Sequence, residues 1–297
     1  MKTSDGIRLF YDTNFNLKDY DPNRPLLVFN YGLVCNPNHF KFQYPFFEEQ
    51  GYQLLIYNYR GHYNSSGLED IDQCTFANMA KDLNELLSFL KVDNYILIGH
   101  SMGVNICLEY MSSFASPRLQ KAIIISGTVL PPQNIMFNSG IVDLVTPLIE
   151  HIAKEYPDIT QKVWEMNYLN PLNHKILYNG GFNTKQVSID FVKFYAKKVS
   201  ELSPHLFLQL MREMRDHDIF NRLENITTPT LIVGGDLDKI IPLHLQYIIH
   251  QKIPNSELYI IKDGSHVPQS DFPEMLNERI NFFIRGTQEK SPQRLQA

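Results

Sequence analysis

The chain has 297 residues and a formal net charge of -5 at pH 7, and 43% of its residues are hydrophobic. A chain of this length and composition can bury a substantial core, as one large domain or two small ones. Lysine and arginine are dispersed and form no basic stripe, which argues against a nucleic-acid partner. A small neutral or apolar substrate is more compatible with this composition.

Two further features concern location. No apolar run approaches the roughly 18 residues that a membrane-spanning helix requires, and the first residues contain no apolar core typical of a secretion signal. The three cysteines, Cys35, Cys74 and Cys107, are an odd number without the C-x-x-C pairs of a zinc site. We therefore expect a cytoplasmic protein without a membrane span, whose cysteines are small core residues. The sequence does not indicate the oligomeric state.

Apolar runs typical of strands alternate with helical periods along the chain. Asp5-Gly6 followed by IRLFYD predicts the start of an antiparallel hairpin at one edge of a sheet. Residues 76–90 carry leucines on one side and predict an amphipathic helix. Runs without strict alternation are typical of parallel strands covered on both faces. Such runs are Leu26–Asn30, Tyr52–Tyr59, Tyr95–Gly99, Lys121–Ser126, Thr230–Gly235 and Glu257–Lys262. Their order predicts a doubly wound, mostly parallel α/β sheet.

Residues 94–104, NYILIGHSMGV, are the most informative stretch. An apolar run stops at Gly99, Ser101 follows, and a helical period begins after Gly103. This pattern predicts a strand, a tight turn and a helix, with Ser101 at the apex of the turn. A strained turn of this kind lifts a nucleophilic hydroxyl clear of the backbone, and it accepts only small residues two positions either side of the serine.

The alternation fails between Val129 and Thr228. A loop of that length without structure of its own is not credible in a compact domain. The segment is mostly helical in period, so we expect a helical cap over residues 131–204, inserted after the sixth strand. Residues 1–130 and 205–297 would form the core domain. We expect most of the cap's aromatic side chains to pack between helices and the rest to line a pocket.

Two later strands are followed by residues that could activate a serine. Asp236 and Asp238 follow the strand Thr230–Gly235, and His266 follows the strand Glu257–Lys262. The carboxyl ends of parallel strands meet at one edge of such a sheet, so these side chains can approach Ser101. A serine hydroxyl needs a base, and the base needs a third group that holds it in the right tautomer.

Three further segments carry a family resemblance. Residues 58–67, NYRGHYNSSG, resemble a D-x-R-G-H-G-x-S turn, with Asn58 and Tyr63 as departures. Residues 30–33, NYGL, resemble an H-G-x oxyanion loop, with Tyr31 in place of histidine. His266 and residues 271–274, DFPE, resemble a G-x-H…E-x-P-E ending. Together with the serine turn, these motifs resemble the α/β-hydrolase fold family over nearly the whole chain apart from the cap.

The resemblance implies roles for single residues. Ser101 would be the nucleophile, His266 the general base and then acid, and Asp238 the group that orients the imidazole. The backbone N–H groups of Leu33 and Met102 would form the oxyanion hole. Asp236 is an alternative to Asp238, although the spacing to Pro242 matches the family's G-x-x-D-x-x-x-P pattern at Asp238. No metal or organic cofactor is required by this chemistry.

We expect no catalytic role for the other polar residues. We expect surface or structural roles for His39, His62, His100, His205 and His217, and solvated positions for Asp82 and Asp93. Cys35 lies in the presumed oxyanion loop and is an improbable nucleophile, because no motif places a second histidine and acid beside it.

The expected function is hydrolysis of a small to medium carboxylic ester, with an apolar acyl or aromatic part, through an acyl-enzyme. Alternatives on the same three residues are a thioesterase, lactonase, ring-cleavage product hydrolase, perhydrolase or aminopeptidase, since fold does not settle function. An aminopeptidase would need acidic cap residues facing Ser101. Candidates are Glu150, Glu155, Glu165 and Asp190. A non-catalytic receptor with a hydrolase-like fold is the remaining alternative.

Overall fold

The computed structural model describes residues 1–33, 35–114, 116–130, 148 and 151–286. The predicted start of the cap at residue 131 and the candidate Glu150 lie outside these residues. A seven-stranded sheet occupies the centre, with the order β1-β3-β2-β4-β5-β6-β7. All neighbouring strands are parallel except β1 (Tyr11–Thr13), which runs antiparallel to β3. The parallel strands are β2 (Leu26–Asn30), β3 (Gln53–Tyr57), β4 (Tyr95–His100), β5 (Leu119–Ile125), β6 (Thr230–Gly235) and β7 (Ser256–Ile261).

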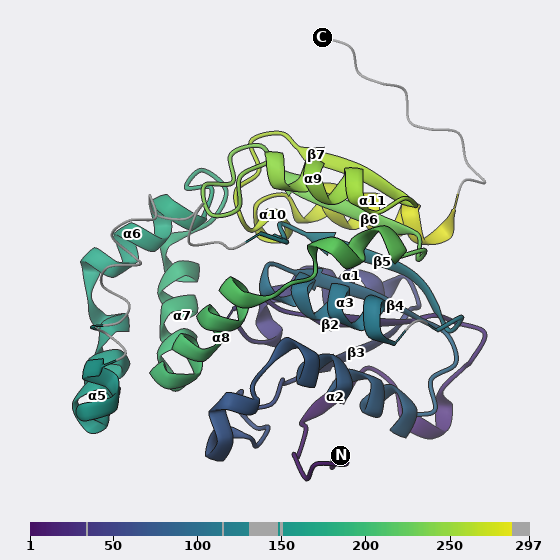
Figure 1. The fold of residues 1–297 in the computed structure, drawn as a ribbon. Helices are drawn as coiled ribbons and strands as arrows, with labels where there is room; N and C mark the ends of the chain where they lie inside the picture. Colours follow the sequence, from purple (N-terminus) through teal and green to yellow (C-terminus); the bar gives the residue numbers. More distant parts are fainter. Residues whose placement is uncertain (34, 115, 131–147, 149–150, 287–297) are drawn as a thin grey trace.

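Helices cover both faces of this sheet (Figure 1). On one face lie α2 (Phe76–Phe89), α3 (Met102–Ser113) and α9 (His244–Lys252), and on the other lie α1 (Gln43–Glu49) and α11 (Pro273–Arg285). Every residue of β2, β3, β4 and β6 is buried as a result. This confirms the doubly wound, mostly parallel sheet that the apolar runs predict.

The predicted N-terminal antiparallel pairing is present but short. Lys2 and Arg8 form an antiparallel bridge across the turn at Gly6, whose φ is +95°. The N–H groups of Thr3 and Leu9 donate across this turn to the carbonyls of Ile7 and Met1. The chain then continues into β1, which pairs antiparallel with β3 at the edge of the sheet, so this region adds one strand to the sheet rather than two. The helical insertion therefore follows the fifth strand, β5, and not the sixth.

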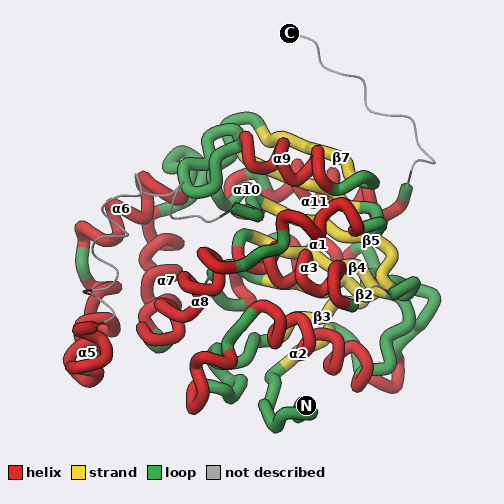
Figure 2. The backbone as a smooth tube through the Cα atoms, viewed as in Figure 1, coloured by secondary structure: helices red, strands yellow, loops and turns green. Residues whose placement is uncertain are grey.

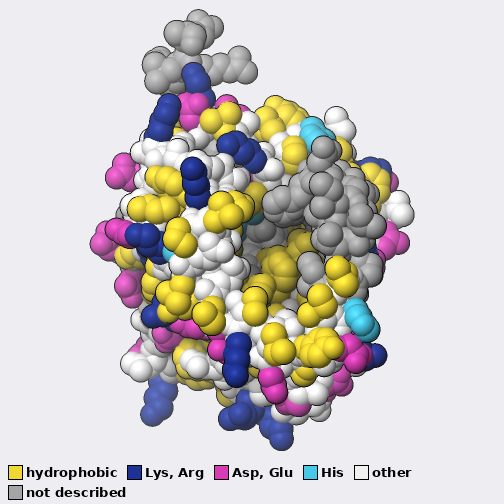
Figure 3. Space-filling model, turned by 90° about the vertical axis from the view of Figure 1, so that its left-hand side faces the viewer, with side chains coloured by type: hydrophobic (Ala, Val, Ile, Leu, Met, Phe, Trp, Pro, Cys, Tyr) yellow, Lys and Arg dark blue, Asp and Glu magenta, His cyan; other side chains and the backbone are white. Residues whose placement is uncertain are grey.

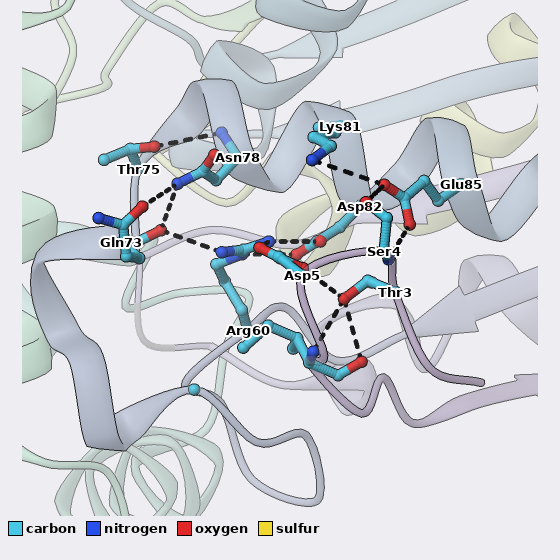
Figure 4. A network of polar contacts seen from close by, with 12 residues as sticks. Thr3, Ser4, Asp5, Arg60, Gln73, Thr75, Asn78, Lys81, Asp82 and Glu85 are labelled. Carbon is cyan, nitrogen blue, oxygen red and sulfur yellow. Dashed lines mark hydrogen bonds and ion pairs between the residues drawn. The ribbon is translucent and has the colours of Figure 1, made fainter.

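A buried ion pair connects this N-terminal turn to the core (Figure 4). Arg60 is fully buried and donates to both carboxylate oxygens of Asp82 on α2, at 2.7 and 2.6 Å, and to Asp5 at 3.0 Å. Asp82 is therefore not solvated, contrary to the sequence-based expectation, whereas Asp93 is exposed. The helical period placed Asp82 near the edge of the apolar face of α2, but it could not show that a buried guanidinium faces it.

Four helices fill the described part of the segment between β5 and β6 (Figure 2). They are α5 (Pro157–Met166), α6 (Pro171–Gly181), α7 (Ile189–Ser200) and α8 (Pro204–Asp216), with a short 3-10 turn, η5 (Asn167–Leu169), between the first two. Proline opens three of these helices, where its missing N–H costs nothing. The side chains of Asn170, Ser188 and Ser203 cap the N-termini of α6, α7 and α8. We call α5 to α8 the inserted helices.

Among the described residues, no helix is both long enough and apolar enough to cross a membrane.

Candidate active site

Ser101 lies at the turn between β4 and α3. Its φ of 52° and ψ of -121° place a non-glycine residue in a strained backbone region. The two flanking glycines are required by close packing. A Cβ on Gly103 would lie 2.1 Å from the carbonyl oxygen of Asn30, and a Cβ on Gly99 would lie 2.8 Å from that of Gly103. The turn can therefore form only with glycine at both positions.

The structure brings Ser101, His266 and Asp238 together. Ser101 Oγ lies 3.1 Å from Nε2 of His266, and Nδ1 of His266 lies 2.9 Å from Oδ2 of Asp238. The other oxygen of Asp238 accepts from the backbone N–H groups of Ile240 and Ile241, at 2.9 and 2.8 Å. Those two bonds fix the carboxylate, so Nδ1 of His266 carries a proton and Nε2 is free to accept one from Ser101. Asp236 is exposed and does not contact His266.

The loop after β2 lies against the serine turn. A Cβ on Gly32 would lie 3.2 Å from Cβ of Ser101, so the chain passes close to the hydroxyl. Within the described part of the chain, no hydrogen bond uses the N–H of Leu33 or of Met102. Met102 is the first residue of α3, where backbone N–H groups have no partner within the helix. Tyr31, in place of the family's histidine, is buried, and its hydroxyl accepts from the Tyr59 N–H at 3.2 Å.

Two buried histidines support the loop that carries His266. His100 Nε2 lies 2.8 Å from the carbonyl oxygen of His266, and His100 Nδ1 lies 2.8 Å from His39 Nε2. Burial lowers the pKa of His39 to about 3 and that of His100 well below its usual value, so both rings are neutral. Both ring nitrogens of His100 therefore have partners other than Ser101, and the ring holds the His266 backbone. No motif in the sequence pointed to His39.

The remaining histidines have structural contacts. His62 is buried, which lowers its pKa to about 4, and its Nδ1 lies 3.1 Å from the Arg60 carbonyl oxygen. His205 lies 3.1 Å from the Ala153 carbonyl oxygen, and His217 lies 3.1 Å from Glu109 on α3. The structural expectation holds for these residues, but His39, His62 and His100 are buried rather than on the surface.

Asp271 also supports the His266 loop. Its Oδ2 accepts from the Ser265 N–H at 2.7 Å, next to His266 in the chain. Asn183, between α6 and α7, donates through its side chain to the Asp263 carbonyl at 2.8 Å. Ser265 in turn donates to the Gly181 carbonyl at 3.2 Å. The inserted helices and the His266 loop are therefore hydrogen-bonded to each other, a link that sequence reasoning missed because the partners are about 80 residues apart.

A cavity of about 550 Å³ opens above Ser101. Its wall combines residues of the sheet edge, including Leu33, Ser101 and His266, with residues of the inserted helices. Five aromatic side chains of the insertion line it, as expected for the part of the set that does not only pack between helices. They are Trp164, Tyr168, Phe182, Tyr195 and Phe207. One wall of the cavity is formed by the insertion, and aromatic side chains of the insertion make up much of that wall.

The face of α5 that is turned to solvent is also apolar. Ile159, Val163 and Met166, on one face of α5, are 59%, 65% and 64% exposed. Figure 3 shows hydrophobic side chains gathered around a hollow on this side of the molecule.

Charged groups in the cavity are few. None of the described residues that line it is an aspartate or glutamate, and Lys239 is the lysine among them. Glu165 and Asp190, on the inserted helices, and Glu155, just before α5, are exposed and are not among the lining residues. All three cysteines are buried and unpaired; burial raises the pKa of Cys35 to about 12, which keeps its thiol protonated. The part of the chain that the structure describes holds no group of three metal-ligating side chains.

Comparisons with known proteins agree with this architecture. A family profile described as "Serine aminopeptidase, S33" matches residues 22–271. The chain is 25% identical to the uncharacterised hydrolase YugF of Bacillus subtilis, covering 95% of this chain and 96% of that protein. It is 22% identical to the bifunctional esterase/perhydrolase DCH of Acinetobacter calcoaceticus, covering 96% of this chain and 98% of that protein.

Solved structures show the same fold. An esterase from Exiguobacterium antarcticum superposes with a TM-score of 0.77 at 23% identity, covering 96% of this chain and 100% of that one. A bromoperoxidase from Bacillus anthracis superposes with a TM-score of 0.74 at 23% identity, covering 95% of this chain and 96% of that one. Because the profile spans most of the chain, the chain belongs to the serine aminopeptidase S33 family of α/β-hydrolases.

Proposed function

We propose that this hydrolase cleaves a small to medium carboxylic ester through an acyl-enzyme on Ser101. The observation that carries the proposal is the continuous contact from Ser101 Oγ through His266 to Asp238, at 3.1 and 2.9 Å, at the floor of an apolar cavity. A nucleophile, a base within hydrogen-bond reach and a group that orients the base are the parts that acyl transfer needs.

The reaction would run in two halves. His266 takes the proton of Ser101 as its oxygen attacks the ester carbonyl, and then gives that proton to the leaving alcohol. Water, activated by the same imidazole, releases the acid and regenerates the serine. The N–H groups of Leu33 and Met102 would bind the oxyanion, and one such donor is typically worth about 3 to 4 kcal/mol of barrier. No step needs a metal or an organic cofactor.

The cavity supports an ester with an apolar acyl or aromatic part. Its lining includes Trp164, Phe182 and Phe207, with few charged groups. An aminopeptidase would hold a substrate ammonium group with a carboxylate, and none of the described lining residues supplies one. The described lining therefore favours an ester over a peptide with a free amino terminus. We also propose that residues 131–204 act as a helical cap on a core of residues 1–130 and 205–297, and that the protein is cytoplasmic.

The decisive experiment uses the intact chain and two readouts. Wild-type protein should hydrolyse p-nitrophenyl acetate or butyrate and react with a fluorophosphonate probe at Ser101. The Ser101→Ala variant should lose both, with a fall in kcat of about a million-fold. Ser88→Ala is the matched control, because Ser88 is exposed on α2 and only caps its own helix. Activity retained without Ser101 would exclude the mechanism.

The acid of the site can be tested in the same assay. Asp238→Asn should lower kcat by about 10⁴-fold, since the amide would hold His266 in the wrong tautomer. Asp236→Asn should leave kcat unchanged. A panel of ester, thioester, lactone and proline-amide substrates would distinguish an ester hydrolase from a thioesterase, a lactonase or an aminopeptidase. A wild-type protein that binds an apolar ligand tightly but does not label at Ser101 would instead be a receptor.

A further inference from the structure

A tyrosine of the inserted helices lines the cavity and has a poorly satisfied hydroxyl. Tyr195, on α7, is one of the lining residues, as is Cys35, and its hydroxyl oxygen lies 3.6 Å from Sγ of Cys35. Among the hydrogen bonds of the described residues, the thiol is the partner of this hydroxyl. A thiol is a weak donor and a weak acceptor, so it satisfies a phenol poorly. Buried tyrosine hydroxyls usually have a stronger partner.

The hydroxyl contacts the loop that passes beside Ser101. Cys35 Sγ would be 3.5 Å from a Cβ on Gly32, and the same Cβ would be 3.2 Å from Ser101 Cβ. Tyr195 therefore reaches across from the inserted helices to the loop that passes over the serine. Burial raises the pKa of Tyr195 well above its usual value, so the hydroxyl keeps its proton and can donate it in a hydrogen bond.

We propose that Tyr195 is a specificity-determining residue, whose hydroxyl donates a hydrogen bond to an oxygen of the substrate outside the scissile carboxyl group. The preferred substrates are then esters with a hydroxyl, ether or keto oxygen in the acyl or alcohol part. Hydrocarbon esters of the same shape leave the hydroxyl with only its thiol partner. This inference rests on the proposed ester hydrolysis at Ser101 and specifies its substrate class.

A second residue holds Tyr195 in place from the core side. Tyr63 occupies the position at which the family's R-G-H-G turn has glycine, and its φ of 46° lies in the region that favours glycine. Its hydroxyl donates to the Lys198 carbonyl at 3.1 Å, one turn of α7 beyond Tyr195. The strained backbone at Tyr63 is therefore coupled to a contact that fixes α7, and α7 in turn fixes where the Tyr195 hydroxyl points. Tyr63 is a positioning residue in this arrangement.

The test compares isosteric ester pairs in wild type and Tyr195→Phe. The first two pairs are p-nitrophenyl esters: the butyrate with the methoxyacetate, and the pentanoate with the β-methoxypropionate. The third pair is butyl acetate with 2-methoxyethyl acetate. The intrinsic reactivity of each ester cancels when the ratio of kcat/KM within a pair is compared between enzymes. Tyr195→Phe should lower that ratio about 3- to 10-fold for at least one pair, the size expected for one neutral hydrogen bond.

Three variants sharpen the interpretation. Tyr178→Phe is the matched control, because its hydroxyl donates to the Thr184 carbonyl and the residue does not line the cavity; its ratios should equal those of wild type. Cys35→Ser offers Tyr195 a stronger competing partner and should lower the oxygenated-to-hydrocarbon ratio. Tyr63→Phe should lower the same ratio, because α7 loses the bond from Tyr63 to the Lys198 carbonyl.

The outcomes are distinguishable from those of the proposed function. If wild type hydrolyses the esters and labels at Ser101, but Tyr195→Phe changes both members of every pair equally, Tyr195 only packs and the inference is wrong. A loss of thermal stability alone, with unchanged ratios, leads to the same conclusion. If wild type neither labels nor hydrolyses any ester, the proposed function itself fails.

Discussion

His100 Nε2 donates to the backbone carbonyl of His266, with 2.8 Å between the two atoms. The residue immediately before Ser101 therefore holds the loop that carries the imidazole facing Ser101. The two halves of the site come from β4 and from the loop after β7, and this bond joins them directly. The relative position of Ser101 and His266 thus depends on a neutral histidine whose two ring nitrogens bond to His39 and to the His266 backbone.

We expect His100→Leu to lower kcat/KM for p-nitrophenyl butyrate about 10- to 100-fold. The reason is positional, since a shift of the His266 loop by about 1 Å is enough for a loss of that size. Steady-state kinetics should show the fall mainly in kcat. His205→Leu is the control, because His205 contacts the Ala153 carbonyl outside the cavity. Equal kinetics for His100→Leu and wild type would mean that other contacts position the loop.

Buried neutral histidines also predict acid sensitivity. The folded-state pKa of His39 is lowered to about 3 and that of His62 to about 4, both from a usual value of 6.5. Below pH 6.5 the unfolded chain binds protons at these rings while the folded chain does not, so stability falls as pH falls from 6.5 toward these values. Each histidine can contribute about 1.4 kcal/mol per pH unit in this window.

Urea unfolding at several pH values measures this effect. The free energy of unfolding should decline steadily from pH 6.5 to pH 4.5. In His39→Phe the slope of this decline should be smaller by up to about 1.4 kcal/mol per pH unit, the contribution of one histidine. His151→Gln is the control, because His151 is exposed on the insertion and should leave the slope unchanged. An identical slope in wild type and His39→Phe would show that protonation of His39 does not lower the free energy of unfolding.

Much of this fold could be read from the sequence because its strands are buried on both sides. Predicted and observed bounds agree at Leu26–Asn30 and Thr230–Gly235, since continuous apolar runs mark such strands. The bond from Arg60 to Asp5, which joins the N-terminal turn to the core, could not be read from a local pattern because its partners are 55 residues apart. His39 escaped notice for the same reason: its function as a support is defined by His100, which only the folded chain brings near it.

The Arg60 and Asp82 pair predicts a large and asymmetric effect on stability. Asp82→Ala would leave a buried guanidinium with the partly exposed Asp5 as its remaining carboxylate partner, so we expect a loss of about 3 to 5 kcal/mol. Asp5→Ala should cost less than about 1 kcal/mol, because the Asp5 side chain is 39% exposed and screened by water. Urea denaturation followed by circular dichroism gives both values. Similar losses for the two variants would contradict this division.

The glycines of the serine turn give the sharpest steric prediction. A Cβ on Gly103 would lie 2.1 Å from a backbone carbonyl oxygen, and neither strand β2 nor helix α3 can move without disturbing the sheet. Gly103→Ala should therefore destabilise the fold by about 3 kcal/mol or more, or prevent folding. Gly180→Ala, on α6, meets nothing within 4 Å and should be neutral or slightly stabilising, since alanine favours a helix. Thermal melts of the two variants test the difference, and a Gly103→Ala protein as stable as wild type would mean that β2 and α3 can separate at this point.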